Sequence, residues 1–403
     1  MKKNSIAQSQ VKKTRHRQKS KLHQIVNRKR SGQAPPQTVG MDIGDKNSRY
    51  CVFNAEGKIL AERSAPTTKK GMTAAFGKMA RSRIALEVGT HSPWVSRLLE
   101  SLGHEVIVAN ARKVRAISDS NGKNDRMDAQ MLGRLARVDG ALLCPIRHRG
   151  EQAQQHLAMI RARAALVDSR TSLVNTARGV TKGFGERLGK CDADQMGGEK
   201  LEGMPAGVQA ALGPVVETVE VMTDKIQGYE KELAEIARKH YPETAVLEQV
   251  SGVGLLIALT FILTLEDPSR FGRSRDVGCY LGLRPRQKDS GESQPQLGIT
   301  KEGDVYLRRL LVQGAHHILG ARGPDTDLQR WGRKLAGEGA AAGQGQSQGQ
   351  SGKKKRRGNR NAKKRAVVAV ARKLAILLHH LWVTGEVYEP LRQQAPAAVG
   401  IPA

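Results

Sequence analysis

Short apolar runs of strand length, separated by turn residues, recur through the first third of the chain. Three of them follow one another through tight connections, which predicts a hairpin meander, and two more alternate with helical patterns, which predicts an α/β layer. The predicted strands are 38–44, 49–57, 58–64, 83–89 and 105–110, and the predicted helices of this layer include 92–103 and 124–138.

Long helical patterns replace the strand pattern beyond residue 150. Apolar and charged residues recur at helical spacing from about Glu151 to Arg178 and from about Pro214 to Lys239, which predicts two long helices in a hairpin. The segment Gly179 to Gly213 carries the helix breakers expected of their connection. A compact helical unit follows from Leu247, and residues 363–383 predict an amphipathic helix that packs on it.

Two segments have compositions that cannot bury a core. No acidic residue precedes Asp42, although lysine and arginine recur from Lys2 to Arg30, and the chain after Gly337 is rich in Gly, Ala, Gln and Ser before the basic run KKKRRGNR. The predicted organisation is a disordered basic arm (1–37), an α/β domain (38–148), a helical hairpin or coiled coil (149–240), a helical domain (241–322), a flexible basic insertion of low complexity (323–362), a C-terminal helix (363–390) and a tail (391–403).

The formal net charge of +29 predicts a polyanionic partner. We expect nucleic acid rather than a membrane, because we find no uninterrupted apolar stretch of about eighteen residues and no apolar segment typical of a secretory signal. The four cysteines form no CxxC pair and fit a reducing cytoplasm, where we expect the protein near the nucleoid. The histidine doublets 316–317 and 379–380 point to different helix faces, which argues against a shared metal.

Four carboxylates are placed where they could share one cleft. Asp42 ends a predicted strand in GMDIG, Glu87 holds the equivalent place in ALEVG, and Asp125 and Asp128 lie three residues apart at the start of a predicted helix. Two divalent cations about 4 Å apart can stabilise both oxygens of a phosphodiester displacement, and oxygen-only ligands favour Mg²⁺ or Mn²⁺. Taken singly, each residue is a weak signal, since Asp at a strand end is often a turn residue, Glu on a strand can face solvent, and Asp near a helix start is usually a cap or a dipole partner.

The order of several motifs resembles a known family. GMDIG, ALEVG and KNDRMDAQ, followed by SGVG, YLGLRPR, a Ser-Gly turn and ITKEGDVYLRRLL, are similar to the DEDD transposases of the IS110 insertion-sequence family, relatives of the Piv invertases. The resemblance runs from about Thr38 to Gly320 and returns for the last helix. It implies an α/β RuvC-like (RNase H-like) first domain whose metals are held by Asp42, Glu87, Asp125 and Asp128, and an all-α helix-hairpin-helix transposase domain.

The same resemblance implies a serine nucleophile that forms a covalent protein–DNA intermediate. Its motif maps to Ser290 in GLRPRQKDSGESQPQLGITK. Asp289 and Glu292 flank this turn where the family more often carries neutral or basic residues, so Ser293 stays an alternative. Considered without the resemblance, DSGES is more simply explained as a polar turn.

Candidate nucleic-acid contacts are spread over both halves of the chain. SGVG resembles a helix-hairpin-helix turn, whose amides can approach phosphate, although a helix connection needs glycine for its own geometry. Arg308 and Arg309 fit either phosphate contacts or an ordinary solvated helix face. The predicted contacts are Lys123, Arg126, Ser251, Gly252, Gly254, Arg284, Arg286, Lys288, Lys301, Arg308 and Arg309.

The leading hypothesis is therefore a transposase or site-specific recombinase that acts on the DNA of element ends and target. The resemblance implies a homo-oligomer, a dimer or a tetramer, and makes an element-encoded bridge RNA a candidate partner. A hydrolytic, Holliday-junction type RuvC-like nuclease would share the carboxylates but use water. An actin-like ATPase or sugar kinase would need further Gly-rich nucleotide loops that we do not find, and a non-catalytic nucleic-acid-binding protein would leave the four carboxylates unexplained.

Overall fold

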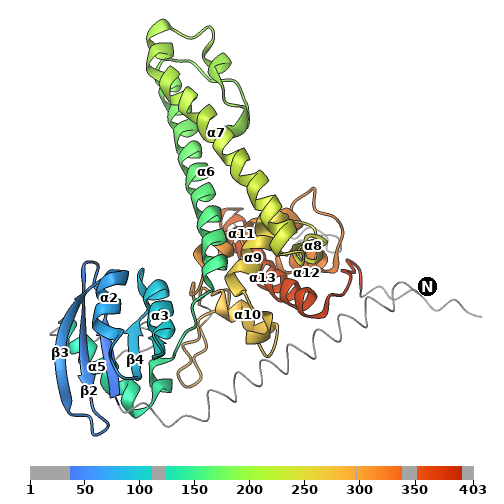
Figure 1. Ribbon diagram of the computed structural model, residues 1–403. Helices are drawn as coiled ribbons and strands as arrows, with labels where there is room; N and C mark the ends of the chain where they lie inside the picture. Colours follow the sequence, from blue (N-terminus) through green and yellow to red (C-terminus); the bar gives the residue numbers. More distant parts are fainter. Residues whose placement is uncertain (1–36, 111–123, 296, 338–351, 393–403) are drawn as a thin grey trace, which may run out of the picture. The chain divides into compact units, whose positions relative to one another are not determined.

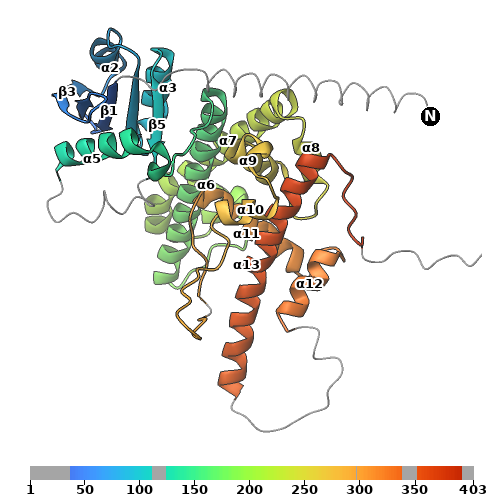
Figure 2. The ribbon, with the colours of Figure 1, turned by 90° about the horizontal axis from the view of Figure 1, so that it is seen from below.

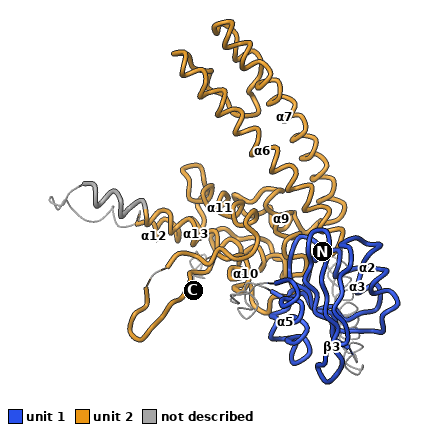
Figure 3. Tube along the Cα trace, turned by 90° about the vertical axis from the view of Figure 1, so that its left-hand side faces the viewer, with its two compact units in different colours: residues 1–148 blue, residues 149–403 orange. Residues whose placement is uncertain are grey.

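The computed structural model describes residues 37–110, 124–295, 297–337 and 352–392, which divide into two compact units, 1–148 and 149–403 (Figure 3). The predicted basic arm lies almost wholly outside the described residues, as does Lys123. Each unit is considered by itself.

Unit 1 is a mixed five-stranded sheet with helices on both faces (Figure 1). The strand order is β3-β2-β1-β4-β5; β1, β2 and β3 form the predicted antiparallel meander, and β4 runs parallel to both β1 and β5. Its elements are β1 (Gln37–Asp42), β2 (Asn47–Phe53), β3 (Ile59–Pro66), α2 (Lys69–Phe76), β4 (Ser82–Glu87), α3 (Ser92–Ser101), β5 (Glu105–Ala109), α5 (Asp125–Val138) and the 3₁₀ turn η1 (Gly140–Leu143).

Alternate residues of the central strands face opposite helix layers. Met41 of β1 and Leu86 of β4 join α2 and α3 in one apolar cluster, whereas Ala85 of β4 packs with α5 in another. Gly40 of β1 also contacts α5. Helices α2 and α3 therefore cover one face of the sheet and α5 covers the other (Figure 2).

Backbone contact between β1 and α5 sets how closely the helix approaches the sheet. A Cβ on Gly40 would lie 1.9 Å from the Ala129 carbonyl oxygen and 2.3 Å from the Gly133 nitrogen. A Cβ on Gly133 would lie 2.4 Å from the ring of Phe53. Only glycine at both positions lets the helix lie this close.

We therefore expect Gly40→Ala to destabilise unit 1 by about 1–3 kcal/mol, because the added methyl pushes α5 off the sheet. Thermal unfolding followed by circular dichroism measures the effect. Gly89→Ala is the matched control in the same unit, since a Cβ there would meet no other described residue within 4 Å apart from its chain neighbours. Equal stability of the two variants would contradict the contact between β1 and α5.

Unit 2 is helical. Its elements are α6 (Glu151–Gly183), η2 (Ala193–Gln195), η3 (Gly198–Leu201), α7 (Ala206–His240), α8 (Thr244–Glu248), α9 (Leu255–Leu265), η4 (Pro268–Arg270), α10 (Arg275–Tyr280), α11 (Val305–Leu319), α12 (Asp327–Leu335) and α13 (Gly352–Thr384). Helices α6 and α7 run side by side as the predicted hairpin (Figure 1).

Helix α7 begins eight residues before the predicted start and carries Pro214 inside it. An internal proline costs a helix about 3 kcal/mol, which is why the sequence pattern favoured a start there. Val208 and Leu212 of the added turns are buried with Val174 of α6 in one apolar cluster. Burying each such side chain contributes about 1.5–3 kcal/mol, which offsets the proline.

Part of the predicted flexible insertion 323–362 is helical. Thr326 caps α12 by accepting a hydrogen bond from the Gln329 backbone nitrogen at 3.0 Å, and Gly332 packs so closely that a Cβ there would lie 2.6 Å from Leu319 and Val370. Helix α13 begins at Gly352, eleven residues earlier than predicted. Long-range packing, which composition does not reveal, fixes α12.

Helix α13 is the exception to our expectation about membrane spans. Its residues Asn361–Thr384 are long and apolar enough to cross a bilayer by length and composition, and half of that apolar window is buried. Val370, Leu374 and Leu378 have no exposed surface and belong to the main apolar cluster of unit 2. A core helix has the same properties, so this helix is weak evidence for a membrane span.

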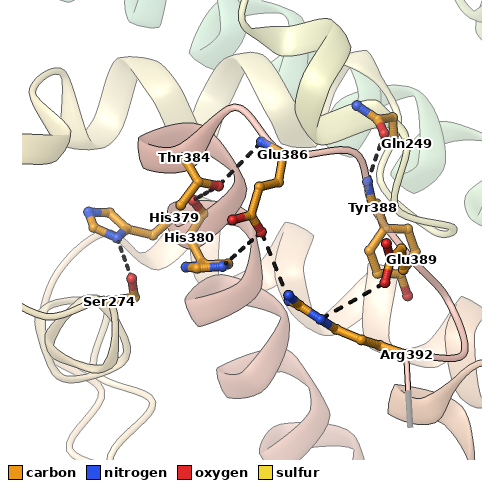
Figure 4. Close-up of polar contacts among 9 residues, drawn as sticks. All are labelled: Gln249, Ser274, His379, His380, Thr384, Glu386, Tyr388, Glu389 and Arg392. Carbon is orange, nitrogen blue, oxygen red and sulfur yellow. Dashed lines mark hydrogen bonds and ion pairs between the residues drawn. The ribbon is translucent and has the colours of Figure 1, made fainter. Parts of the chain in front are cut away.

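Polar contacts fix the C-terminal end of α13 (Figure 4). His379 is 2% exposed, and its two ring nitrogens lie 3.0 Å from the Ser274 hydroxyl and 3.0 Å from the Pro268 carbonyl oxygen. After the helix, the Tyr388 nitrogen donates to Gln249 at 2.9 Å. His379 therefore holds the helix end in the core, a structural role for one member of the histidine doublets.

Candidate active site

Asp42 and Glu87 lie at the carboxyl ends of neighbouring parallel strands. The register of β1 and β4 places the two residues side by side, at about the 4.8 Å spacing of adjacent strands. Two positions earlier, Gly40 and Ala85 face α5. Because side chains alternate along a strand, both carboxylates belong to the face that α5 covers.

The first turn of α5 supplies two more carboxylates. Asn124 caps the helix by accepting a hydrogen bond from the Arg126 backbone nitrogen at 2.9 Å. Asp125 and Asp128 follow in the first turn, where the helix dipole stabilises negative charge. Asp125 is exposed, whereas Asp128 is only 7% exposed. A carboxylate this buried points to a role beyond capping, since the cap is already supplied.

These four carboxylates line one cavity of about 480 Å³ in unit 1. The residues around it are Asp42, Ile43, Asp45, Glu87, Val88, Gly89, Thr90, His91, Asp125 and Asp128. The three segments that sequence analysis selected separately thus come together, because β1, β4 and α5 meet at this edge of the sheet.

The donor chemistry of the cavity fits a hard divalent cation, since carboxylate oxygens are the ligands that Mg²⁺ and Mn²⁺ prefer. Among the residues that the structure describes, no three His, Cys, Asp or Glu side chains are grouped so that they could hold one ion together. Mg²⁺ usually keeps several water ligands and binds a protein through one or two carboxylates, so a pair of these side chains is sufficient to hold an ion here.

Two titratable residues of this cavity, Asp45 and His91, were missed by sequence analysis. His91 Nε2 lies 3.3 Å from Asp45 Oδ1, and Trp94 Nε1 donates to His91 Nδ1 at 3.1 Å. Because Nδ1 accepts the hydrogen bond from Trp94, a neutral His91 ring carries its hydrogen on Nε2, which donates a hydrogen bond to Asp45. Both residues belong to loops after strands, and the only sequence signal was the second aspartate of the GMDIGD segment.

Ser290 lies in unit 2, at the tip of an exposed finger whose two extended arms, called its strands below, are joined by isolated bridges at Pro285–Ile299 and Ser290–Ser293. We define the serine finger as the described residues of 284–300. Ser290 and Ser293 exchange two backbone hydrogen bonds of 3.1 and 3.0 Å, and Gly291 between them has a φ of +54°. A glycine at the first central position with positive φ is typical of a tight hairpin turn. Ser290 and Ser293 are thus paired across this turn, and both are exposed.

Three predicted phosphate contacts, Arg284, Arg286 and Lys288, lie on the strand that leads to Ser290, and all are exposed. Arg284 contacts the side-chain oxygen of Gln287. Lys301 is exposed directly after the finger. Four cationic side chains thus lie on or beside the segment that carries the two serines.

The other predicted arginine contacts are in different surroundings. Arg126 in unit 1 is exposed and forms a 2.5 Å ion pair with Glu62 of β3, which lowers the pKa of that carboxyl. Arg309 donates to both carboxylate oxygens of Asp168, at 3.2 and 3.1 Å, and lies over the ring of Tyr306. Both side chains are exposed. To bind a polyanion, Arg126 would have to share or release its contact with Glu62, and Arg309 its contact with Asp168.

The prediction of a phosphate contact or a solvated face for Arg308 was wrong. Its side chain is buried, and one guanidinium nitrogen donates to the backbone oxygens of Leu281 at 3.1 Å and Glu302 at 2.7 Å. Burial lowers the pKa of Arg308, whereas the nearby Asp304 carboxylate raises it. The position is internal because α11 packs against the segment around the finger, which the local sequence does not reveal.

Comparisons with known proteins identify the family of the chain. The DEDD transposase model named for IS110 matches residues 39–184, and the model of the transposase IS116/IS110/IS902 family matches residues 244–329, so that together they span more than half of the chain. The chain belongs to the IS110 family of transposases. The transposase of insertion element IS1111A from Coxiella burnetii is 28% identical over 304 residues, covering 73% of this chain and 81% of the relative. That of IS1328 from Yersinia enterocolitica is 28% identical, covering 69% and 82%.

The two matches of this transposase include both candidate sites. The first covers all four cavity carboxylates, and the second covers the serine finger and Arg308.

The SGVG segment also falls in the second match, between α8 and α9. A Cβ on Gly252 would lie 2.9 Å from the Gly314 carbonyl oxygen, so this glycine permits packing against α11, whereas Gly254 has open space and begins α9.

Proposed function

We propose that this transposase cuts and rejoins DNA with a metal-assisted serine nucleophile. Unit 1 is a RuvC-like catalytic domain, its four cavity carboxylates bind Mg²⁺ or Mn²⁺, and Ser290 of the serine finger attacks the DNA. The helical unit contains a helix-hairpin-helix element at Ser251–Gly254. The substrate is the DNA of the element ends and the target, and we expect the protein to work in the cytoplasm beside the chromosome.

The convergence of Asp42, Glu87, Asp125 and Asp128 on one cavity carries this proposal. Uncompensated carboxylates repel a DNA backbone, so an acidic cavity in a DNA-acting chain of net charge +29 would need a cation to offset this repulsion. Bound there, the ions supply Lewis-acid stabilisation of the charge that develops on the reacting phosphate. The strand ends and the helix start fix where the ligands are held.

Serine attack conserves the energy of the phosphodiester bond. The Ser290 Oγ forms a bond to phosphorus, the bond from phosphorus to one deoxyribose oxygen breaks, and the serine proton passes overall to that leaving oxygen. Rejoining is the reverse reaction with a different deoxyribose hydroxyl, which releases the serine. Arg284, Arg286 and Lys288 contact phosphates of the bound strand and orient it toward the finger tip.

An RNA from the element is the additional partner that we propose on the resemblance to guided recombinases. The high positive charge supports a second polyanion, and a homo-oligomer, a dimer or a tetramer, would hold two DNA ends at once. With 3% aromatic residues, base stacking contributes little, so recognition of sequence would fall to pairing with such an RNA.

The test is a cleavage assay on supercoiled DNA that carries the element ends, with and without RNA transcribed from the flank of the element. We expect a protein–DNA adduct that survives denaturant, forms with Mg²⁺ or Mn²⁺, and disappears with a chelator and in Asp42→Ala. Cleavage that yields free ends without any adduct would instead indicate a hydrolytic RuvC-like nuclease. Cleavage that continues in the presence of a chelator would contradict the proposed dependence on a divalent metal ion.

A further inference from the structure

Residues on both sides of the serine finger approach each other at its base. The Lys301 nitrogen donates to the Gly282 carbonyl oxygen at 3.1 Å, and Thr300 donates to Arg284 at 2.9 Å. A Cβ on Gly282 would lie 2.2 Å from the Glu302 oxygen. The strand that enters the finger and the strand that leaves it are therefore in direct backbone contact.

The backbone at this base is also held in an unusual conformation. Gly282, Gly303 and Lys301 all have positive φ, of +67°, +72° and +58°. A lysine with positive φ is uncommon and persists only where surrounding contacts enforce it. A Cβ on Gly303 would lie 2.1 Å from the Tyr280 carbonyl oxygen, which is a second close backbone contact at the same place.

Arg308 joins the two strands at this base. It extends from α11, and a single guanidinium nitrogen bonds Leu281, just before the finger base, and Glu302, just after it. The side chain is 9% exposed, so its charge is stabilised by these carbonyl oxygens rather than by water. Helix α11 is itself fixed at this end, because Asp304 caps it and forms a 2.5 Å ion pair with Arg161 of α6.

We propose that Arg308 is a positioning residue for the serine finger: by tying together the two strands at its base it fixes the direction in which Ser290 is presented to DNA. The finger itself offers few other restraints, since its described residues from Arg284 to Pro295 are exposed and Ile299, near its base, is partly buried against the core of unit 2. The catalytic consequence rests on the proposed role of Ser290. The claim that Arg308 restrains the finger does not depend on the role of Ser290.

The two parts are measured separately in the full-length protein. Arg308→Met keeps much of the side-chain volume but removes the donors, and Arg308→Lys keeps the charge with a different donor geometry. Hydrogen exchange of the backbone amides of the finger reports the restraint without any DNA. Arg309→Met is the matched control, because the neighbouring side chain is exposed and bonds Asp168 instead.

We expect finger amides to exchange about tenfold faster or more in Arg308→Met, while amides of α9 and α11 keep their protection. The rate of adduct formation at saturating DNA should fall about tenfold or more with little change in DNA affinity, and Arg308→Lys should recover part of both effects. Arg309→Met should leave finger exchange unchanged.

Unchanged finger exchange in both Arg308 variants would overturn the proposal. So would a uniform loss of protection throughout unit 2, because Arg308 would then only stabilise the core. If finger exchange rises as expected but wild-type protein forms no serine adduct, the restraint stands and the proposed role of Ser290 fails.

Discussion

Ser290→Ala is expected to abolish the covalent protein–DNA adduct, lowering its rate of formation by more than about a thousandfold. In the proposed mechanism the Ser290 Oγ attacks phosphorus, and alanine has no oxygen at that position. DNA binding should persist, because the cations of the finger remain. Denaturing gel electrophoresis of labelled DNA measures adduct formation, and a filter-binding titration measures affinity.

Ser293→Ala provides the matched comparison, since Ser293 is paired with Ser290 across the same turn and is equally exposed. We expect this variant to retain at least a substantial fraction of the adduct. The opposite result, with activity lost in Ser293→Ala and kept in Ser290→Ala, would move the nucleophile three residues along the chain while leaving the finger itself in place.

Asp128→Asn is expected to reduce adduct formation by at least about a hundredfold, because an amide cannot supply the charge that a carboxylate ligand gives to a divalent cation. The change preserves the shape of a side chain that is only 7% exposed. A reduced activity that rises again at higher Mn²⁺ or Mg²⁺ concentration would identify weakened metal binding. Single-turnover assays over a range of metal concentrations measure this.

Glu100→Gln is the control for this substitution, because Glu100 is an exposed acid of α3 in the same unit and outside the cavity. It should behave as wild type at every metal concentration. If Asp128→Asn is also fully active, the cavity carboxylates do not act as a metal site, and the acidic cavity would need another explanation.

The grouping of the four carboxylates in one cavity could be predicted from sequence because local patterns fix most of its geometry. Strand periodicity determines which face a residue occupies, so Asp42 and Glu87, at the ends of two adjacent strands, had to lie near each other once the strands paired in parallel. A three-residue spacing puts Asp125 and Asp128 on one face of the helix start. Only the approach of α5 to β1 through Gly40 needed the structure.

Other features depend on contacts between segments distant in the sequence. The helical pattern of the sequence predicts that Arg308 lies on the surface of an amphipathic helix. It is buried because the base of the finger packs against α11. Pro214 lies within α7 because burial of neighbouring side chains offsets its cost. His91 belongs to no recognisable sequence motif. It lies at the cavity because the loop that contains it follows β4.

The identity of the amino acid joined to DNA tests the central claim most directly. Trapped adduct from wild-type protein would be digested with nuclease and protease, and the peptides analysed by tandem mass spectrometry. We predict a nucleotide on Ser290 in the finger peptide, absent when metal is chelated. DNA cut under the same conditions with no modified residue on any peptide would contradict serine attack and indicate hydrolysis by water.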